Sequence, residues 1–155
     1  MKILEIIIVA VLSTLPNHQR PHPELSIVVR PTDLDVKGHV NNARYVEYLQ
    51  WSRWDWMDRY GLTNEKLLEL NTVLVVVNIN INYRHESKYG DTLKTSVVVK
   101  KIGEKSFVLQ QVVKKDDLVI VDAEVVMVAV DLKTRKSRLI PEELKEVLDN
   151  NCHGL

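Results

Sequence analysis

The stretch ARYVEYLQWSRWDWMDRY, residues Ala43–Tyr60, predicts a long helix around which the rest of the chain must fold. It contains neither proline nor glycine, and Gly61 follows it directly, where a left-handed C-terminal cap is least costly. Apolar side chains repeat at helical spacing along one stripe: Val46, Leu49, Trp56, Met57 and Tyr60. Further aromatic side chains lie largely outside this stripe: Tyr45, Tyr48, Trp51 and Trp54. A helix that is aromatic on several sides indicates that other structure surrounds it.

The pattern changes from helical to alternating after this helix. TVLVVVNININY (Thr72–Tyr83) alternates strictly, which predicts a strand in an antiparallel sheet with one covered face. We expect one face to carry Val75, Val77, Ile79, Ile81 and Tyr83, and the other Val76, Asn78, Asn80 and Asn82. The asparagines then form either a solvated back face or a polar ladder at a subunit interface, and the first is favoured.

The remaining elements complete an α+β outline. Residues 25–30 predict a strand before the long helix, and residues 91–103, 105–115 and 118–132 predict three strands joined by short hairpin turns. A short helix is predicted over residues 63–70 with Thr63 as its cap, and a last helix begins at Pro141. One long helix on one face of a mostly antiparallel sheet is an α+β arrangement.

Length and composition predict one globular domain. The 155 residues suit a single domain over residues 23–150, with an N-terminal apolar segment and linker at 1–22 and a tail at 151–155. Twenty-one basic and 21 acidic residues give no net charge, so the overall charge does not favour binding to nucleic acid. Cys152 is the only cysteine, which excludes an internal disulfide and fits the cytoplasm. No Cys/His cluster resembles a metal site, and no cofactor is expected.

The first residues, MKILEIIIVAVLSTL, allow two interpretations. The apolar run is shorter than the roughly 20 residues that a membrane-spanning helix needs. It has the length of a signal-peptide core behind Lys2, which would make the protein exported. Glu5 and the lack of a clear cleavage site favour the alternative, a strand or helix that covers an apolar surface.

TDLDVKGHVNNARY (Thr32–Tyr45) carries turn-forming, acidic and imidazole side chains just ahead of the long helix. A calcium loop would fit Asp33, Asp35 and Gly38 at its first, third and sixth positions. Its fifth and twelfth positions are Lys37 and Arg44, however, and a cation needs oxygen ligands there. We therefore exclude a calcium loop.

Two other roles for this stretch are compatible. Asn41 or Asn42 can cap the helix, which leaves Asp35 as a turn residue and His39 as a packed or solvated ring. In a catalytic role, Asp35 and His39 face one point ahead of the helix. Unpaired backbone N–H groups and a partial positive charge lie at that point and would polarise a carbonyl group.

The sequence resembles a known family at several points. DLDVKGHVNNARYVEYLQWSRWD (Asp33–Asp55), VVVNININYR and DLKTRK are similar to the bacterial hotdog-fold acyl-CoA thioesterases of the 4-hydroxybenzoyl-CoA thioesterase-like superfamily, especially the long-chain acyl-CoA thioesterase III type. The match runs from Ser26 to Leu148. It implies a hotdog fold, in which an antiparallel sheet wraps around a central helix. It also implies a homodimer or homotetramer whose active site lies at the interface.

The resemblance assigns roles to individual residues. The catalytic carboxylate falls on Asp35 and the motif histidine on His39, while backbone amides near Val40 and Asn42 would hold the oxyanion. A related plant acyl-carrier-protein thioesterase motif has an asparagine where this chain has Lys37, so that role is not carried over. A cation there would either favour the charged form of Asp35 or point at solvent or a phosphate.

Substrate contacts are expected at three further places. KSF (residues 105–107) is similar to a segment that contacts coenzyme A phosphates, so Lys105 and Ser106 are candidates, and Arg84 could add charge. A solvated hairpin turn is an equal alternative for this segment. Tyr48, Trp51 and Trp54 are candidates for an acyl pocket, with core packing as the favoured alternative.

The resemblance implies hydrolysis of fatty acyl-CoA to fatty acid and coenzyme A without a metal or redox cofactor. Asp35 would act as general base or as nucleophile. Alternatives are an acyl-carrier-protein thioesterase, a hotdog enoyl-CoA hydratase or dehydratase, and an acyl-CoA-binding module without turnover. DVKGHVNN lacks the Asn-Pro element typical of hydratases, and the presence of Asp35 and His39 argues against a binding module.

Overall fold

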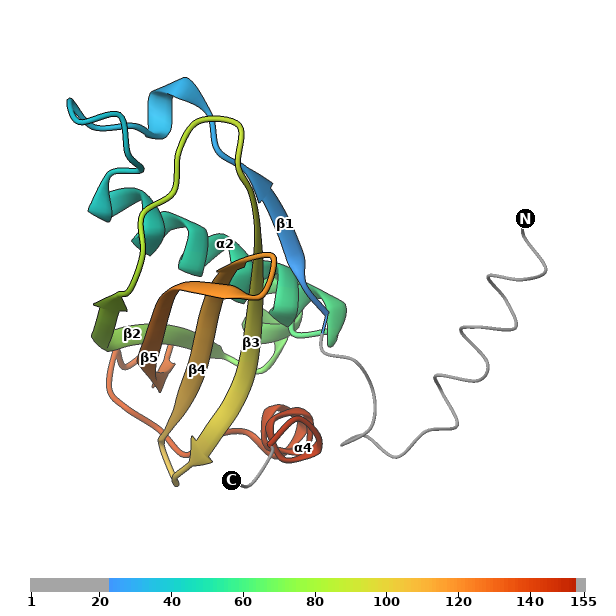
Figure 1. Cartoon of the computed structure of the whole chain (residues 1–155). Coiled ribbons are helices and arrows are strands. Elements are labelled where there is room, and N and C mark those ends of the chain that lie inside the picture. Colours follow the sequence, from blue (N-terminus) through green and yellow to red (C-terminus); the bar gives the residue numbers. More distant parts are fainter. Residues whose placement is uncertain (1–22, 153–155) are drawn as a thin grey trace.

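The computed structural model describes residues 23–152, whose strands form one antiparallel sheet with the order β1-β3-β4-β5-β2. The strands are β1 (Leu25–Val28), β2 (Thr72–Tyr83), β3 (Thr92–Ile102), β4 (Ser106–Lys115) and β5 (Leu118–Asp131). The helix α2 (Asn42–Arg59) crosses one face of this sheet, which curls around it (Figure 1). The predicted α+β class and the predicted hotdog arrangement are confirmed.

The helix α2 begins and ends close to the predicted residues. Asn41 is the N-cap, and its Oδ1 accepts a hydrogen bond from the Ala43 amide at 2.9 Å. The helix ends at Arg59, and Gly61 takes the left-handed conformation with φ of 74°. A side chain other than glycine would be strained at such a φ.

Tyr45 and Tyr48 extend the buried surface of α2 beyond the predicted apolar stripe. Both lie outside that stripe and are 3% and 0% exposed, as expected for a helix that other structure surrounds. Their neighbours explain the burial, because both pack with residues of β1, β3 and β5 in one apolar cluster. Val46, which we placed inside the stripe, is only half-buried. The sheet therefore encloses more of the helix than a single stripe requires.

A β-bulge in β2 corrects the predicted alternation of that strand. Pairing with β5 shifts by one residue between Val76 and Asn78, so Val77 has no partner in the register. The bulge moves the apolar side chains of the two halves to the same face. Val76 and Ile79 consequently pack on the core, whereas Val75 and Val77 are 40% and 57% exposed. The asparagines Asn78, Asn80 and Asn82 are exposed.

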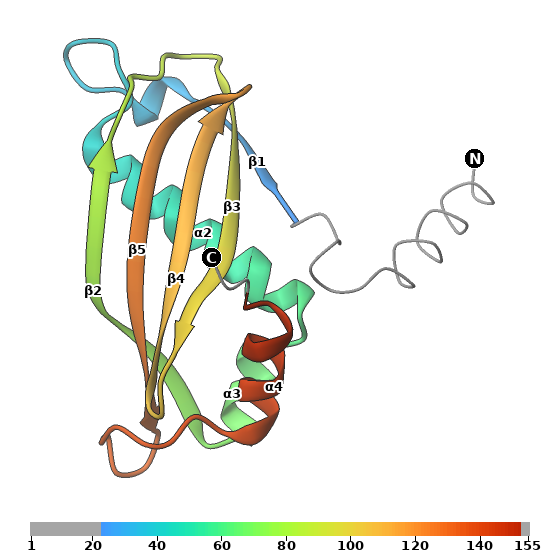
Figure 2. The same ribbon diagram turned by 60° about the horizontal axis from the view of Figure 1, so that its bottom comes forward.

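Two short helices close the sheet near the C-terminal half of α2 (Figure 2). They are α3 (Asn64–Glu69), capped by the Thr63 hydroxyl, and α4 (Glu142–Asn150), which starts after Pro141. Lys66 of α3 pairs with Glu143 of α4, with 2.5 Å between Nζ and Oε2. Within residues 23–152 no helix is long and apolar enough to cross a membrane. The interpretations of residues 1–22 fall outside the described part of the chain.

The core is divided into two clusters along α2. One lies around the N-terminal half of the helix and includes Tyr48 and Leu49, both fully buried. The other lies around the C-terminal half and includes Trp56 together with Leu144 of α4. The polar loop before α2 adjoins the first cluster, which places the candidate functional residues at that end of the molecule (Figure 1).

Candidate active site

A tight turn before α2 presents Asp35. Its backbone carbonyl accepts from the Gly38 amide at 3.0 Å, and Gly38 adopts a φ of 79° that favours glycine. The Oδ1 atom of Asp35 accepts from the Lys37 amide at 2.8 Å and from the His39 amide at 3.3 Å. No residue among those described donates to Oδ2, so this oxygen is available to a ligand or a water molecule.

The neighbouring aspartate has a structural role. Asp33, in the 3-10 helix η2 (Pro31–Asp33), is 3% exposed, and its carboxylate accepts from the Arg30 amide at 2.8 Å. Its carbonyl accepts from the Asn41 amide at 2.9 Å, which joins η2 to the cap of α2. Of the two aspartates in DLD, Asp33 therefore holds the loop and Asp35 is the chemically available one.

His39 is oriented by a residue that the sequence did not single out. Its Nε2 lies 3.1 Å from Oε2 of Glu86, and Oε1 of Glu86 lies 3.2 Å from Nζ of Lys88. His39 also forms an isolated β-bridge with Lys88, which explains why the segment after β2 reaches the loop. The imidazole thus pairs with Glu86, while the Asp35 carboxylate contacts only the backbone amide of His39.

The amides at the start of α2 correct one predicted role. The Val40 amide donates to the Ser87 carbonyl at 2.9 Å, so it is not available to an oxyanion. The amide of Asn42 donates to no group within residues 23–152 and lies in the first turn of α2. A helix start leaves such donors unsatisfied and carries a partial positive charge. Asn42 is thus the remaining candidate of the predicted pair.

These groups share one open, polar cavity of about 370 Å³, which we call the loop cavity. It is lined by Asp35, Lys37, His39, Val40, Asn42, Tyr45, Tyr83, Arg84, His85 and Glu86. The structure thus brings four predicted residues, Asp35, His39, Val40 and Asn42, together with the predicted Arg84. The Arg84 guanidinium is already paired, with 2.6 Å between its Nε and Oδ2 of Asp122. That pairing lowers the pKa of the Asp122 carboxyl.

Lys105 and Ser106 lie away from the loop cavity of their own chain. They stand at the turn between β3 and β4, where the Lys105 carbonyl accepts from the Ala129 amide at 2.9 Å. Figures 1 and 2 both place this turn at the opposite end of the sheet from the loop before α2. The prediction that both contact substrate therefore requires a second protomer.

The three predicted acyl-pocket residues lie in different surroundings. Tyr48 is fully buried against the Tyr45 and Trp51 rings, and burial raises the pKa of its hydroxyl. Trp51 is half-buried, with the Arg30 guanidinium 6.0 Å from its ring centroid. Trp54 is 57% exposed and lines a second cavity. Of these three residues, only Trp54 thus lines either cavity.

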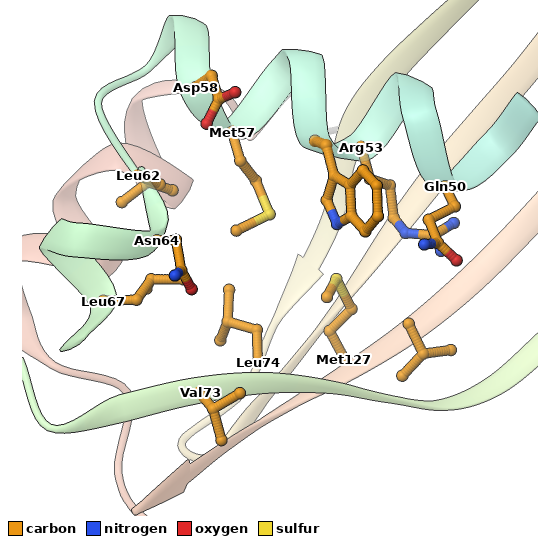
Figure 3. A pocket seen from close by; sticks show the side chains of 12 residues that line it. Gln50, Arg53, Met57, Asp58, Leu62, Asn64, Leu67, Val73, Leu74 and Met127 are labelled. Carbon is orange, nitrogen blue, oxygen red and sulfur yellow. The ribbon is translucent and has the colours of Figure 1, made fainter. Parts of the chain in front are cut away.

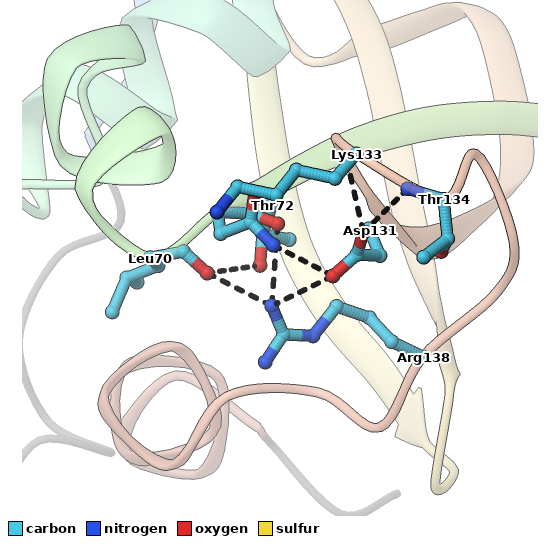
Figure 4. A network of polar contacts seen from close by, with 7 residues as sticks. Leu70, Thr72, Asp131, Lys133, Thr134 and Arg138 are labelled. Atoms are coloured by element: carbon cyan, nitrogen blue, oxygen red, sulfur yellow. Dashed lines mark hydrogen bonds and ion pairs between the residues drawn. The ribbon is translucent and has the colours of Figure 1, made fainter.

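The second cavity, which we call the helix cavity, measures about 530 Å³ and lies between α2, α3 and β2 (Figure 3). A polar network fixes the end of its β2 wall (Figure 4). Asp131 accepts from the Thr134 amide at 2.8 Å and from Nδ2 of Asn71 at 2.6 Å. Arg138 donates to the Leu70 carbonyl at 2.9 Å. The junction of α3 and β2 is thereby tied to the end of β5.

Neither cavity is a metal site by its donor set. Among residues 23–152, no group of three His, Cys, Asp or Glu side chains is placed to hold a metal ion. The loop cavity instead combines a carboxylate, an imidazole and a free helix-start amide. Such a set is suited to activating a nucleophile beside a polarised carbonyl group.

An antiparallel sheet curled around one helix, with this turn at the helix start, defines a hotdog protein of the thioesterase type. The model of the thioesterase-like superfamily matches residues 29–148, and the chain belongs to that superfamily. It is 39% identical over 132 residues to the long-chain acyl-CoA thioesterase FadM of Escherichia coli (strain K12), covering 81% of this chain and 96% of the relative. Acyl-CoA thioesterase YbgC of Haemophilus influenzae is 27% identical, covering 73% and 84%.

Solved structures agree with this assignment. The probable thioesterase YbaW from Escherichia coli superimposes with a TM-score of 0.74 at 38% identity, covering 85% of this chain and all of its own. SAV2348 from Staphylococcus aureus, solved in complex with CoA, gives a TM-score of 0.79 at 19% identity and covers 87% and 88%. At that identity the second likeness concerns the fold alone.

Proposed function

We propose that the protein hydrolyses long-chain acyl-CoA thioesters to fatty acid and coenzyme A. The observation that carries this proposal is the meeting of the free Oδ2 of Asp35 and the free amide of Asn42 in one cavity. The identity of 39% with a long-chain acyl-CoA thioesterase supports the choice of substrate. The likeness to YbgC supports the wider class of acyl-CoA substrates.

The thioester carbonyl oxygen would accept from the Asn42 amide at the positive end of α2. One such donor, aimed at developing negative charge, stabilises a transition state by about 3 kcal/mol. Tyr83 supports this geometry, because its hydroxyl donates to the Asn42 carbonyl at 3.2 Å and ties β2 to the helix start. Asn42 would thus be held in place by both its helix and a strand.

Asp35 would supply the nucleophile by one of two routes. As a base it takes a proton from water while the oxygen adds to the carbonyl carbon, and the tetrahedral intermediate then expels coenzyme A thiolate, which is protonated. As a nucleophile it displaces the thiolate to form an anhydride, which water then hydrolyses. Label in the Asp35 carboxylate after a single turnover in heavy-oxygen water identifies the anhydride route with water attack on the aspartyl carbonyl, because the general-base route never exchanges an oxygen of that carboxylate.

His39 would orient the water or protonate the leaving thiolate, held by Glu86 at 3.1 Å. A hydrogen bond to one ring nitrogen of an imidazole fixes the orientation of the ring and decides which role the other nitrogen can take. The Lys37 side chain is exposed and makes no ion pair with Asp35 within 4.0 Å, although its backbone amide contacts Oδ1. Lys37 would therefore meet solvent or substrate phosphate.

The active site would be completed by a second copy of the chain. Within residues 23–152, β2 is an edge strand whose outer row of backbone groups is unpaired, and Val75 and Val77 on it are exposed. A long apolar edge of this kind invites pairing with another strand. Antiparallel pairing of two β2 strands would join the sheets into a homodimer, and two dimers could form a tetramer. Sedimentation as a strict monomer would contradict this part of the proposal.

One assay tests the activity. The protein is incubated with acyl-CoAs of increasing chain length, and the release of free thiol is followed. We expect turnover that rises toward long chains and is lost in Asp35→Asn. Undiminished activity of Asp35→Asn would refute the assigned mechanism. Release from acyl-carrier protein alone, hydration of an enoyl-CoA without thiol release, or binding without turnover would each favour one alternative function.

The domain limits and the cellular location remain predictions. We propose that residues 23–150 form the single catalytic domain and that it acts in the cytoplasm, where acyl-CoA is a metabolic substrate. The single cysteine supports a reducing compartment. Mass spectrometry of the mature protein tests the alternative of export, because cleavage would remove part of residues 1–22.

A further inference from the structure

The helix cavity contains a buried cation that the proposed mechanism does not use. Its volume of about 530 Å³ falls within the range of small-molecule sites, roughly 300–1,000 Å³. Its walls are mainly apolar: Met57, Leu62, Leu67, Val73, Leu74, Val76 and Met127. Arg53 and Gln50 lie at one end of the cavity, and Asp58 lies at the other (Figure 3).

Arg53 has a single neutral partner. It is 4% exposed, and its Nη1 donates to Oε1 of Gln111 at 2.8 Å. Gln111 is itself fully buried and donates through Nε2 to the Leu49 carbonyl at 2.9 Å. Within residues 23–152 no carboxylate lies within 4.0 Å of Arg53, and its Nε and Nη2 make no hydrogen bond. Burial accordingly lowers the pKa of the Arg53 guanidinium.

Within residues 23–152, Arg53 is a buried charge without the carboxylate partner that buried charges normally have. A guanidinium stays protonated in proteins and presents five N–H donors in a fork that fits a carboxylate. Burial of a charge without a counter-ion is strongly unfavourable. Because Arg53 lines the cavity, a ligand there can reach its unused donors. The missing partner is therefore an anionic acceptor that enters the cavity.

We propose that the helix cavity binds an aliphatic carboxylate, with its carboxylate on Arg53 and its chain along the apolar wall. The charges at the two ends favour this orientation, because Asp58 would repel a carboxylate placed at the other end. The Asp131 network keeps the β2 wall in place before the ligand arrives (Figure 4). Free acid binds here without turnover, so the proposal does not rest on the proposed function.

The carboxylate has two possible sources. One is a free fatty acid. The other is an acyl-CoA whose chain carries a thioester to coenzyme A at one end and a free carboxylate at the other end. The first source requires only binding, whereas the second predicts a kinetic preference for one class of thioester, so the two can be separated by experiment.

The decisive experiment titrates the full-length protein with dodecanoate, dodecanol and dodecylamine by calorimetry. These probes share one chain and differ in charge. We expect dodecanoate to bind at least about tenfold more tightly than dodecanol, because it adds charge-assisted hydrogen bonds to the same apolar contacts, and dodecylamine to bind most weakly. Equal binding of the acid and the alcohol would overturn the proposal without any variant.

Two arginines of α2, Arg53 and Arg59, are substituted to test whether Arg53 causes the preference for dodecanoate over dodecanol. Arg53→Met should remove the preference for the acid while the affinity for dodecanol is kept, and Arg53→Lys should retain part of the preference. Arg59→Met is the matched control on α2, because Arg59 is exposed and already paired with Asp55 at 2.7 Å. A folded Arg53→Met that still prefers the acid would refute the assignment. If that variant does not fold, Arg53→Lys and the three probes decide.

Two further arms identify the source and separate the proposals. If the natural ligand is a thioester with a distal carboxylate, the KM for dodecanedioyl-CoA should be at least about tenfold lower than for dodecanoyl-CoA, and Arg53→Met should abolish this difference. If it is a free acid, the two thioesters should have similar KM values. Asp35→Asn should bind dodecanoate like the wild type, so loss of turnover and loss of acid binding are distinguishable.

Discussion

The two ends of α2 differ in their surroundings: an open polar cavity lies at its start, and a packed apolar core lies around its C-terminal half. At its start, the loop cavity is open and polar, and the backbone amide of Asn42 has no hydrogen-bond partner among residues 23–152. Around its C-terminal half, apolar side chains from α2, α3, α4 and the sheet surround Trp56, which is 2% exposed. In the proposed mechanism, reactivity at the first end depends on groups without hydrogen-bond partners, whereas stability at the second end depends on close packing. Mutations should therefore separate activity from stability along the helix.

The two aspartates of DLD provide the largest contrast at the helix start. Asp35→Asn should lower kcat/KM by about a thousandfold, as expected for loss of a catalytic acid or base, with little effect on unfolding. Asp33→Asn should weaken the buried contacts that hold the loop and lower the free energy of unfolding by about 1–2 kcal/mol. Thiol-release kinetics and urea unfolding of both variants check this. The reverse outcome would exchange their roles.

A core substitution should show the opposite behaviour. Leu144→Ala removes a fully buried side chain from the cluster around the C-terminal half of α2, which typically costs about 3 kcal/mol. Leu139→Ala is the control, because Leu139 is 61% exposed and its loss should change stability by less than about 0.5 kcal/mol. Urea unfolding measures both. Equal midpoints would mean that packing around this part of α2 does not limit stability.

The sequence predicted elements better than it predicted their partners. The helix, the strands and the turn with Asp35 and His39 follow from periodicity and local turn chemistry. The bulge at Val77 does not, because pairing with β5 decides it. Similarly, the Ser87 carbonyl that occupies the Val40 amide comes from a distant segment. Glu86 and Arg53 were not predicted, because a charged residue in a sequence does not show whether its partner will be an imidazole, as for Glu86, or a neutral amide, as for Arg53.

Substitution of Glu86 should have a smaller effect on activity, and it tests the proposed role of His39 at the start of α2. Glu86→Gln should lower kcat by about tenfold and leave KM unchanged, because it would loosen His39 without touching substrate. Glu86→Asp should recover part of the loss, which a purely structural role would not require. The kcat and KM values of both variants provide the measurement. A change in KM alone would place Glu86 among the substrate contacts.

The smallest effect concerns acid stability, where both ends of the molecule hold an aspartate. The Lys115 ammonium, 2.7 Å from Asp91, lowers the pKa of that carboxyl, and backbone amides near Thr134 lower the pKa of Asp131. Because the pKa of each carboxyl in the folded protein lies below its unfolded value of about 3.9, the unfolded chain binds more protons than the folded chain at pH values between these two pKa values. The contribution of each carboxyl to the free energy of unfolding is complete above its pKa in the unfolded chain, and it is lost as the pH falls through its pKa in the folded protein.

Lys115→Met tests this linkage at the end that carries the loop. It removes the largest cause of the Asp91 shift, so the urea midpoint should fall less between about pH 5 and pH 3 than in the wild type. Lys145→Met on α4 is the control, since Lys145 is exposed and forms no ion pair among the described residues. An acid dependence unchanged in Lys115→Met would mean that Asp131 and its amide donors, at the opposite end of the sheet, dominate acid unfolding.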